Sequence, residues 1–401
     1  MSALNAGLPK PAAINTAFPV GDLAPKSGQS ALLTMRDGSQ WLRTGAVIPR
    51  AGYPDAAAVE HLRAHIFTEI TGATAIAATG VATDGNGTFV VAYNSTTQVL
   101  VSNDYGATWT LRAHNSGGGA ISDVVWTGIR FAGVGNDATG VFGATSSDGI
   151  TWAQSTVATA LVGYTVITAK ACWTGTGVIV VAQSNTTAGI WTSPTGLSGT
   201  WTARTAALAI NSAPQIDGFG ANALIVLSTA SATQQKSLDT GATWVSQSIG
   251  SANATGTKPI VLANNVAIVM LTATTYTFTT DFVNWSPTAF SAGVRAVNGG
   301  TFFKTPAGRV YGIGSGLNIV LFTDDGFAWR EQAVSWLIYT DAATSPASCL
   351  FCFDGVRTAV CLGLGVSRKP RVASSSFGFS NGVGTGVTDS STGLTLYARI
   401  K

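Results

Sequence analysis

Apolar and polar residues follow one another along this chain in short blocks that recur about every 44 residues. Each block begins with a glycine-rich turn, continues with an apolar run, crosses a polar stretch and ends in a second apolar run. Short apolar runs rich in Val, Ile and Thr and bounded by Gly, Asn and Ser are typical of β-strands joined by tight turns. The blocks cover residues 85–104, 127–148, 175–193, 220–239, 307–325 and 353–375.

A short polar sequence that contains a tryptophan closes most of the blocks. VSNDYGATWT and KSLDTGATWV, which begin at Val101 and Lys236, carry Ser, Asp, Gly, Thr and Trp at the same offsets. Counted from the first copy, the aspartates of the five copies are 44, 91, 42 and 44 residues apart, and the double interval holds a degenerate copy that ends at Trp201. Because one active site is not built five times, the repetition indicates architecture.

Seven units of this length fill residues 66–373. Units of roughly 40–50 residues with about four strands each predict a β-propeller, in which repetition around an axis leaves only short sheet edges. A parallel β-solenoid is the alternative, but its coils are shorter and would not place one Trp in every unit. The sequence therefore predicts an all-β fold, a seven-bladed β-propeller.

The pattern S-x-D-x-G-x-T-W resembles the Asp-box, or BNR repeat, of sialidases, sortilin-like receptors, xyloglucanases and bacteriophage tail proteins. The resemblance implies that each copy is the hairpin turn between the third and fourth strands of a blade. In such a turn the carboxylate can accept bonds from nearby backbone amides, Gly supplies a positive φ and Trp folds over the base of the hairpin. Binding of Ca²⁺ or of a ligand by the aspartates is the functional alternative. We expect the structural role for Ser102, Asp104, Gly106, Trp109, Asp148, Gly149, Trp152, Trp201, Ser237, Asp239, Gly241, Trp244, Asp281, Trp285, Asp325, Gly326 and Trp329.

The two ends of the chain do not follow the repeat. Residues 1–65 predict an arm rich in Pro and Gly, a strand pair and a short helix from about Pro54 to His65, and residues 374–401 predict a terminal strand. The stretch WLRTG at 41–45 and the closing GLTLYARIK are similar to segments of bacteriophage tail and tail-fibre proteins, and this resemblance implies that the arm attaches to a virion. His61 and His65 have a spacing that can hold a metal ion, although packed or solvated histidines are the simpler interpretation. No metal or cofactor is expected.

The composition limits the partners. Charged residues make up only 10% of the chain and the net charge is +3, without a basic run, so no nucleic-acid partner is expected. The apolar runs are shorter than the roughly 18–20 residues that span a bilayer, and the first residues lack the pattern of a secretory signal. No membrane insertion is therefore expected. We expect buried free thiols, because no zinc-binding spacing accompanies Cys172, Cys349, Cys352 and Cys361.

The acidic residues bear on the choice between an enzyme and a binding protein. The glutamates are Glu60, Glu69 and Glu331, and none is placed to assist the tyrosine of a sialidase-like site. A glycosidase needs two carboxylates about 5–10 Å apart. Four aspartates are candidates for such a pair, but nothing selects two of them: Asp123, Asp137, Asp217 and Asp354. We do not expect an enzyme, and a tail-associated glycosidase acting on bacterial surface polysaccharide stays the alternative.

The loops on one face of the predicted propeller vary in length and are rich in Asn, Ser, Thr and Asp, which suit hydroxylated ligands such as glycans. The candidate binding residues are Asn94, Asn136, Asp137, Asn185, Tyr164, Trp336 and Tyr339. We expect a bacteriophage tail or tail-fibre protein, made in the host cytoplasm and carried on the virion. Its expected partners are a host-surface glycan or receptor, other tail proteins and a second copy of itself. A cellular assembly factor with the same fold is a third hypothesis.

Overall fold

The chain divides into two units, each described here by itself. One comprises Met1–Ile66, Ala333–Ser335 and Ser374–Lys401, and the other comprises Phe67–Gln332 and Trp336–Ala373. The computed structural model describes most of residues 68–374 and the backbone of six short strands outside that range. The gaps within the first range are 94, 96, 115–118, 137–139, 159–165, 185–187, 207–213, 228–231, 251–257, 263–264, 273–274, 290–301, 305–309, 314–318, 324–325, 327–328, 334–348, 355–357 and 366.

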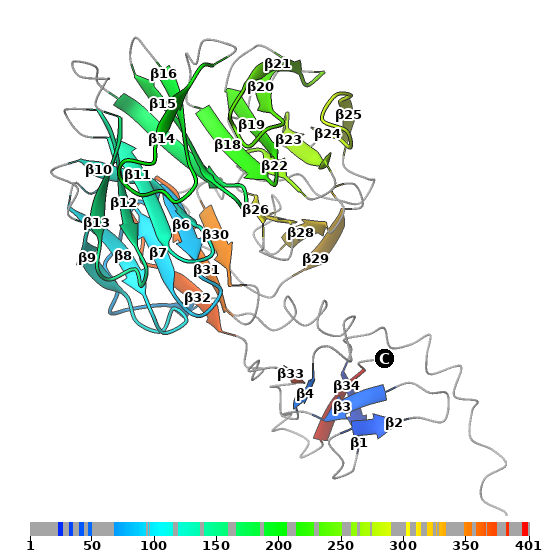
Figure 1. The fold of residues 1–401 in the computed structure, drawn as a ribbon. Coiled ribbons are helices and arrows are strands. Elements are labelled where there is room, and N and C mark those ends of the chain that lie inside the picture. The colour runs from blue at the N-terminus through cyan, green and yellow to red at the C-terminus, as the bar shows by residue number, and fades with distance from the viewer. Residues whose placement is uncertain are drawn as a thin grey trace, which may run out of the picture. The chain divides into compact units, whose positions relative to one another are not determined.

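The larger unit is a β-propeller, whose described residues form seven four-stranded antiparallel sheets, or blades (Figure 1). Blade 1 contains β6 (Gly80–Thr83), β7 (Phe89–Ala92), β8 (Gln98–Ser102) and β9 (Thr110–Ala113); blade 2 contains β10 (Ala120–Trp126), β11 (Phe131–Asn136), β12 (Val141–Ser146) and β13 (Ala153–Ala158). Blade 3 contains β14 (Val166–Trp173), β15 (Val178–Ser184), β16 (Ala188–Ser193) and β17 (Thr202–Arg204); blade 4 contains β18 (Pro214–Phe219), β19 (Asn222–Leu227), β20 (Thr233–Ser237) and β21 (Val245–Ser248). Blade 5 contains β22 (Ile260–Val261), β23 (Ala267–Met270), β24 (Thr275–Thr279) and β25 (Ser286–Ala289); blade 6 contains β26 (Phe303–Lys304), β27 (Val310–Ile313), β28 (Ile319–Thr323) and β29 (Arg330–Ala333).

Blade 7 combines strands from the two ends of the propeller. It contains β30 (Cys349–Phe353), β31 (Thr358–Gly363) and β32 (Arg371–Ser374), and its fourth strand is β5 (Thr68–Glu69). The segment after β5 continues along this blade, where Ile76 and Arg368 exchange backbone hydrogen bonds of 2.9 Å. Because the fourth strand comes from earlier in the chain, no turn joins the third strand to the fourth. This explains why the seventh sequence unit lacks the Ser-Asp-Trp sequence.

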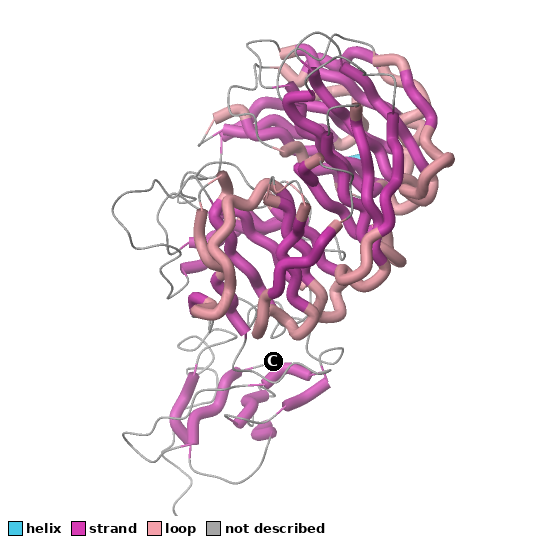
Figure 2. The backbone as a smooth tube through the Cα atoms, turned by 90° about the vertical axis from the view of Figure 1, so that its left-hand side faces the viewer, coloured by secondary structure: helices cyan, strands magenta, loops and turns pink. Residues whose placement is uncertain are grey.

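The hydrophobic core lies between adjacent blades. Phe89 and Val91 on β7 pack in one cluster with residues of blade 7, whereas Val90 and Ala92 pack in another with residues of blade 2. Successive side chains of a strand point to opposite faces, so a strand buried on both faces needs a continuous apolar run. Further clusters join blades 2 and 3, 3 and 4, 4 and 5, and 5 and 6. Figure 2 shows the described strands lying side by side within the blades.

The glycines of the tryptophan turns pack against the preceding blade. Gly241 of blade 4 has a φ of +82°, and a Cβ there would lie 2.8 Å from Ile179 Cδ1 and 2.9 Å from Thr192 Cγ2, both in blade 3. Gly106 of blade 1 lies in the same way against Val372 of blade 7, and Gly149 of blade 2 against Val101 of blade 1. Glycine is therefore required twice, for its backbone conformation and for the close approach of the neighbouring sheet.

Blade 5 replaces this glycine with Phe282. Its φ is +57°, and its side chain is fully buried in the cluster that joins blades 4 and 5. In the other blades, side chains of the preceding blade occupy the space beside the turn glycine. In blade 5 the phenylalanine ring occupies this space. Lys236 of blade 4 donates a hydrogen bond to the Phe282 carbonyl, which adds a polar contact between the same two blades.

The smaller unit contains both ends of the chain. Its four-stranded sheet has the order β1 (Leu23–Lys26), β34 (Thr395–Arg399), β3 (Gln40–Arg43), β2 (Leu32–Thr34), and a second pair joins β33 (Gly382–Gly384) to β4 (Val47–Pro49). The sequence analysis treats the two ends as separate segments, whereas β34 lies between β1 and β3 and pairs with both. The helix predicted from Pro54 to His65 lies outside the described residues.

The cysteines correct one expectation. Cys172 and Cys352 are buried free thiols, but Cys361 is disulfide-bonded. Cysteine spacing along the chain can indicate a zinc site, but it does not show which residues of neighbouring strands come close enough to cross-link.

We predict that Gly241→Ala destabilises the propeller by roughly 2–4 kcal/mol, because the methyl group adds overpacking against blade 3 to left-handed backbone strain. Gly128→Ala is the matched control, since Gly128 has a φ of +89° and nothing within 4 Å of the added Cβ. The control should lose only about 1 kcal/mol. Urea unfolding measures both values, and equal losses in the two variants would contradict packing of the turn glycine on its neighbour.

Candidate functional site

The tryptophan turns are held by their serine and aspartate side chains. Asp104 Oδ1 accepts hydrogen bonds from Thr108 N at 2.8 Å and from Ser102 Oγ at 2.9 Å, and Oδ2 accepts one from Thr108 Oγ1 at 2.6 Å. Gly106 N donates to Ser102 Oγ at 2.8 Å. The turn around Asp239 repeats these bonds with Ser237, Thr243 and Gly241. The carboxylates thus bind donors of their own turns.

The shorter turns keep the carboxylate but change its donors. Asp148 Oδ1 accepts from the backbone amides of Ile150 and Thr151, and Asp281 Oδ1 accepts from those of Val283 and Asn284. In blade 6, Gly326 N donates to Thr323 Oγ1 at 2.9 Å, and Asp325 lies outside the described residues. In the degenerate turn of blade 3, Ser193 Oγ accepts from Gly196 N at 2.7 Å, without an aspartate.

The tryptophans pack between blades and close these turns. The indole N–H groups of Trp109, Trp152 and Trp244 donate to the carbonyls of the turn glycines at 2.9–3.0 Å. Trp201 instead donates to Ser155 Oγ of blade 2, at 3.0 Å. Trp285 Nε1 has no hydrogen-bond partner among the described residues. Trp329 is buried in the cluster between blades 5 and 6.

Hydrogen bonds lower the pKa values of the turn aspartates. Partial desolvation, the largest single influence at Asp104, Asp148 and Asp239, raises the pKa, but the hydrogen bonds together outweigh it. At Asp281 the backbone amides of Asn284 and Val283 are the main cause, and they lower the pKa of the carboxyl well below its usual range. Donors that favour the ionised form account for this direction.

Of the candidate binding residues, the structure describes Asn136. It is the last residue of β11, partly exposed, and pairs with Ala120 and Val141 at the connection to the third strand of blade 2. The other candidates lie outside the described residues: Asn94, Asp137, Tyr164, Asn185, Trp336 and Tyr339.

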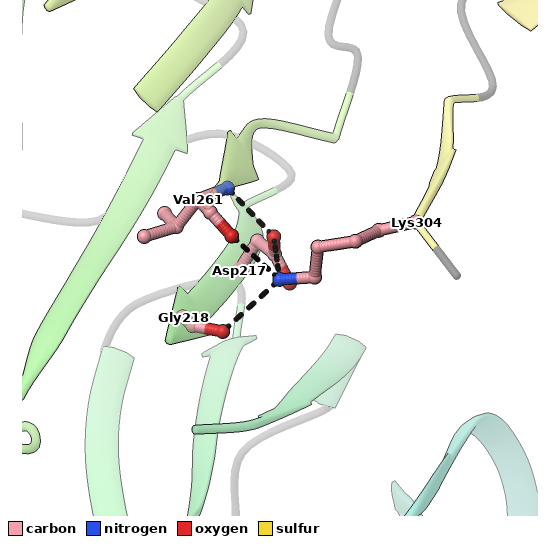
Figure 3. Close-up of polar contacts among 4 residues, drawn as sticks. All are labelled: Asp217, Gly218, Val261 and Lys304. Carbon is pink, nitrogen blue, oxygen red and sulfur yellow. Dashed lines mark hydrogen bonds and ion pairs between the residues drawn. The ribbon is translucent and has the colours of Figure 1, made fainter. Parts of the chain in front are cut away.

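A second group of polar residues lies on the first strands of the blades. Asp217 on β18 accepts a hydrogen bond from the backbone N of Val261 on β22 at 2.8 Å, and its Oδ2 lies 2.8 Å from Lys304 Nζ on β26 (Figure 3). The same ammonium donates to the carbonyls of Gly218 at 3.2 Å and Val261 at 2.7 Å. Three consecutive blades are thus joined where their first strands meet.

Blades 1 to 3 repeat this arrangement. Asp123 on β10 accepts from the backbone N of Ala171 on β14 at 3.0 Å, and Ser122 Oγ donates to the Ala169 carbonyl at 2.8 Å. Lys170 Nζ reaches back to the carbonyls of Thr79 at 3.0 Å and Ser122 at 3.4 Å. In both places an aspartate binds the next blade and a lysine binds the two preceding blades.

These contacts bear on the proposed carboxylate pairs. Asp123 accepts two backbone N–H groups, and Asp217 accepts one and holds the Lys304 ammonium. Asp354 Oδ1 accepts from the backbone N of Thr358 within its own turn, and Asp137 lies outside the described residues. Two lysines of this arrangement are not among the candidates drawn from the sequence: Lys304, which pairs with Asp217, and Lys170, which donates to backbone carbonyls of blades 1 and 2. The signal was available, because lysine is rare in this chain and Lys170 and Lys304 interrupt apolar runs.

Within the described residues no group of three or more His, Cys, Asp or Glu side chains is arranged to hold a metal ion. His61 and His65 lie outside those residues. None of the described helical segments is both long and apolar enough to cross a membrane.

Comparisons with solved structures show the fold. No protein-family model matches the sequence, and no curated protein matches it. The chain is similar to YCF48 bound to D1 peptide, with a TM-score of 0.51 and 14% identity over 77% of this chain and 95% of that one. It is also similar to streptogramin B lyase, with a TM-score of 0.53, 11% identity and coverage of 77% and 97%. A catalytically inactive virginiamycin B lyase from Staphylococcus aureus with quinupristin has a TM-score of 0.51, 10% identity and coverage of 77% and 98%. Identities this low establish the β-propeller fold alone.

We predict that acid weakens the folded state through the turn aspartates. Their pKa values are lowered by folding, so their contribution to stability is complete above the unfolded value near 3.8 and is lost as the pH falls through the folded values. Asp239→Asn should therefore flatten the dependence of the urea midpoint on pH between pH 5 and pH 2. If the urea midpoint of the variant depends on pH as steeply as that of the wild-type chain, the turn does not stabilise the ionised form of Asp239.

We predict that Lys304→Met destabilises the propeller by roughly 2–4 kcal/mol, because the Asp217 carboxylate, whose side chain is only 7% exposed, loses its cation. Lys369→Met is the control, since Lys369 Nζ donates to the carbonyl of Thr71 in an exposed position. The control should change stability by about 1 kcal/mol or less. Calorimetric melting distinguishes the two, and a Lys304→Met variant as stable as the control would contradict the bridging role.

Proposed function

We propose that this chain is a bacteriophage tail or tail-fibre protein whose smaller unit attaches to the virion and whose propeller presents loops to a glycan on the host surface. The observation that carries the proposal is that segments from both ends of the chain build the smaller unit. Both ends of the chain meet in one sheet, with β34 between β1 and β3. In an attachment module built in this way, the propeller sequence lies between the two segments that form the sheet.

We further propose that the propeller is of the Asp-box type. Support comes from the repeated bonds of the turns: a Ser or Thr hydroxyl, an Asp carboxylate and the Trp indole each bind the backbone of the turn in which they lie. The aspartate side chains accept these hydrogen bonds and thereby stabilise their turns. The resemblance to phage tail proteins among Asp-box proteins supports the assignment to a virion.

Recognition is assigned to the face that carries the connections between second and third strands and between successive blades. The opposite face carries the tryptophan turns and the short turns between first and second strands, whose backbone groups are hydrogen-bonded internally, as at Thr127 and Thr174. The recognition face includes Asn136. In the sequence, connections of the same kind carry the stretches NSTT, GNDATG and SNTT, which are rich in neutral donors and acceptors. Such groups match the hydroxyls of a surface glycan.

We predict that removing residues 375–401 prevents incorporation into virions as completely as removing residues 1–65. The reason is that each deletion removes strands from the same small sheet. Virions are produced in cells that supply only the variant, purified, and analysed by mass spectrometry for the chain. Circular dichroism melting of each purified variant is the control, since the propeller strands from β5 to β32 remain in both.

Wild-type chain in virions, with both variants absent, supports the attachment role of the smaller unit. Incorporation of either variant at the wild-type level would contradict that role. Absence of the wild-type chain from purified virions would contradict the proposed function itself.

A further inference from the structure

Four polar residues and one glycine occupy equivalent positions on, or just before, the first strands of five consecutive blades. The equivalence follows from the strand pairing. In each blade the Ser or Thr of the tryptophan turn pairs with a residue of the second strand, and that residue pairs in turn with one residue of the first strand. In blades 1 to 5 this first-strand residue is Thr83, Trp126, Trp173, Gly218 and Val261. The residues three positions earlier in the sequence are, in blade order, Gly80, Asp123, Lys170, Gln215 and Lys258. We call this set the axial layer, because the first strands of these five neighbouring blades contact one another in succession.

Part of the axial layer is fully engaged. Asp123 accepts hydrogen bonds from the backbone N of Val124 and of Ala171, and Lys170 donates to two carbonyls. Gly80 gives the Asp123 carboxylate its room, since a Cβ at this glycine would lie 2.4 Å from Oδ1. These residues hold blades 1 to 3 together.

The other two side chains of the layer, those of Gln215 and Lys258, are available to bind a ligand. Gln215 and Lys258 lie on adjacent blades, both are partly exposed, and neither side chain has a hydrogen bond or ion pair within the described part of the chain. Together they offer an ammonium, two amide N–H donors and one amide oxygen acceptor. Apolar side chains would be expected at a position that served packing alone, as at Ile216 beside Gln215.

We propose that Gln215 and Lys258 bind the carboxylate and a neighbouring hydroxyl of an acidic sugar, of the uronic acid class. The ammonium and the amide N–H groups match the carboxylate oxygens, and the amide oxygen matches a sugar hydroxyl. The charged groups of the layer, Asp123, Lys170 and Lys258, together with the adjoining Asp217–Lys304 pair, sum to one positive charge, which favours an anionic ligand over a neutral one. The proposal deepens the glycan recognition proposed above and rests on it.

Lys258 keeps its charge at neutral pH. Burial alone would lower the pKa of this ammonium, but the carboxylates of Asp217 and Asp123 raise it above its ordinary value. Lys258 lies two residues before β22, where the chain enters blade 5 from the connection that follows β21. The ammonium is therefore on the side of the recognition face, where an entering glycan would reach it first.

Binding of trigalacturonate to the full chain, measured by isothermal titration calorimetry, tests the proposal. We expect Lys258→Gln to raise the Kd about tenfold or more and Gln215→Ala to raise it about threefold or more, because each removes a hydrogen-bonding group from the ligand. Lys258→Arg keeps the charge and should bind within a few-fold of the wild type. Lys26→Gln is the matched control, since it removes one positive charge from the smaller unit and should leave the Kd unchanged.

Two further ligands distinguish the source of the carboxylate. Monomeric galacturonate that binds as tightly as the trimer would indicate a site for small free acids, which would overturn the assignment to a glycan. Maltotriose, which has the hydroxyls but no carboxylate, should bind at least tenfold more weakly than trigalacturonate.

The outcomes separate this inference from the proposed function. No binding of trigalacturonate by the wild-type chain, or an equal loss of affinity in Lys26→Gln and Lys258→Gln, would overturn the role of the axial layer while leaving a virion protein that recognises neutral glycans. Binding that depends on Lys258, in a chain that is absent from virions, would support the axial layer and contradict the proposed function.

Discussion

The contact between each blade and its neighbours is the constraint on which the rest of this structure depends. Each four-stranded sheet is narrow, and a single blade cannot bury both of its faces by itself. The apolar runs of the second strands therefore divide their side chains between two clusters, as Phe89 and Val90 do on β7. A ring is the arrangement in which every such face is covered.

Polar contacts reinforce this ring at two radii. At the periphery the tryptophan turns rest on the preceding blade, with a glycine at the point of closest approach or, in blade 5, the buried ring of Phe282. Near the axis Asp123 and Asp217 accept backbone N–H groups of the following blade, and Lys170 and Lys304 donate to the two preceding blades. Buried charges of this kind are costly unless paired, and here each one has partners in other blades. Near the same axis, Lys258 and Gln215 have no hydrogen bond or ion pair among the described residues, and the proposed ligand is therefore assigned to the axial layer.

Sequence reasoning predicted the repeat, the all-β class and the propeller, because hydrophobic period and turn chemistry are local properties. It could not predict that β5 completes blade 7 or that β34 pairs with β1 and β3, since these pairings join residues far apart in the chain. The candidate site shows the same division. The turn residues around Asp104 and Asp239 were found from their spacing, whereas Lys304 and Asp217 belong to blades two apart and became neighbours only through closure of the ring. Six of the seven predicted loop residues lie outside the described residues, so their role stays a prediction.

Hydrogen exchange at single-residue resolution tests the bonding between blades most directly. The amides of Ala171 and Val261 donate to aspartates of the preceding blade, at 3.0 and 2.8 Å. If side chains near the axis hold the blades together, these two amides exchange only when the whole propeller unfolds, as slowly as the amides within the central strands. Fast exchange at both amides in an otherwise protected propeller would contradict the bonds and, with them, the ring of mutually supporting blades.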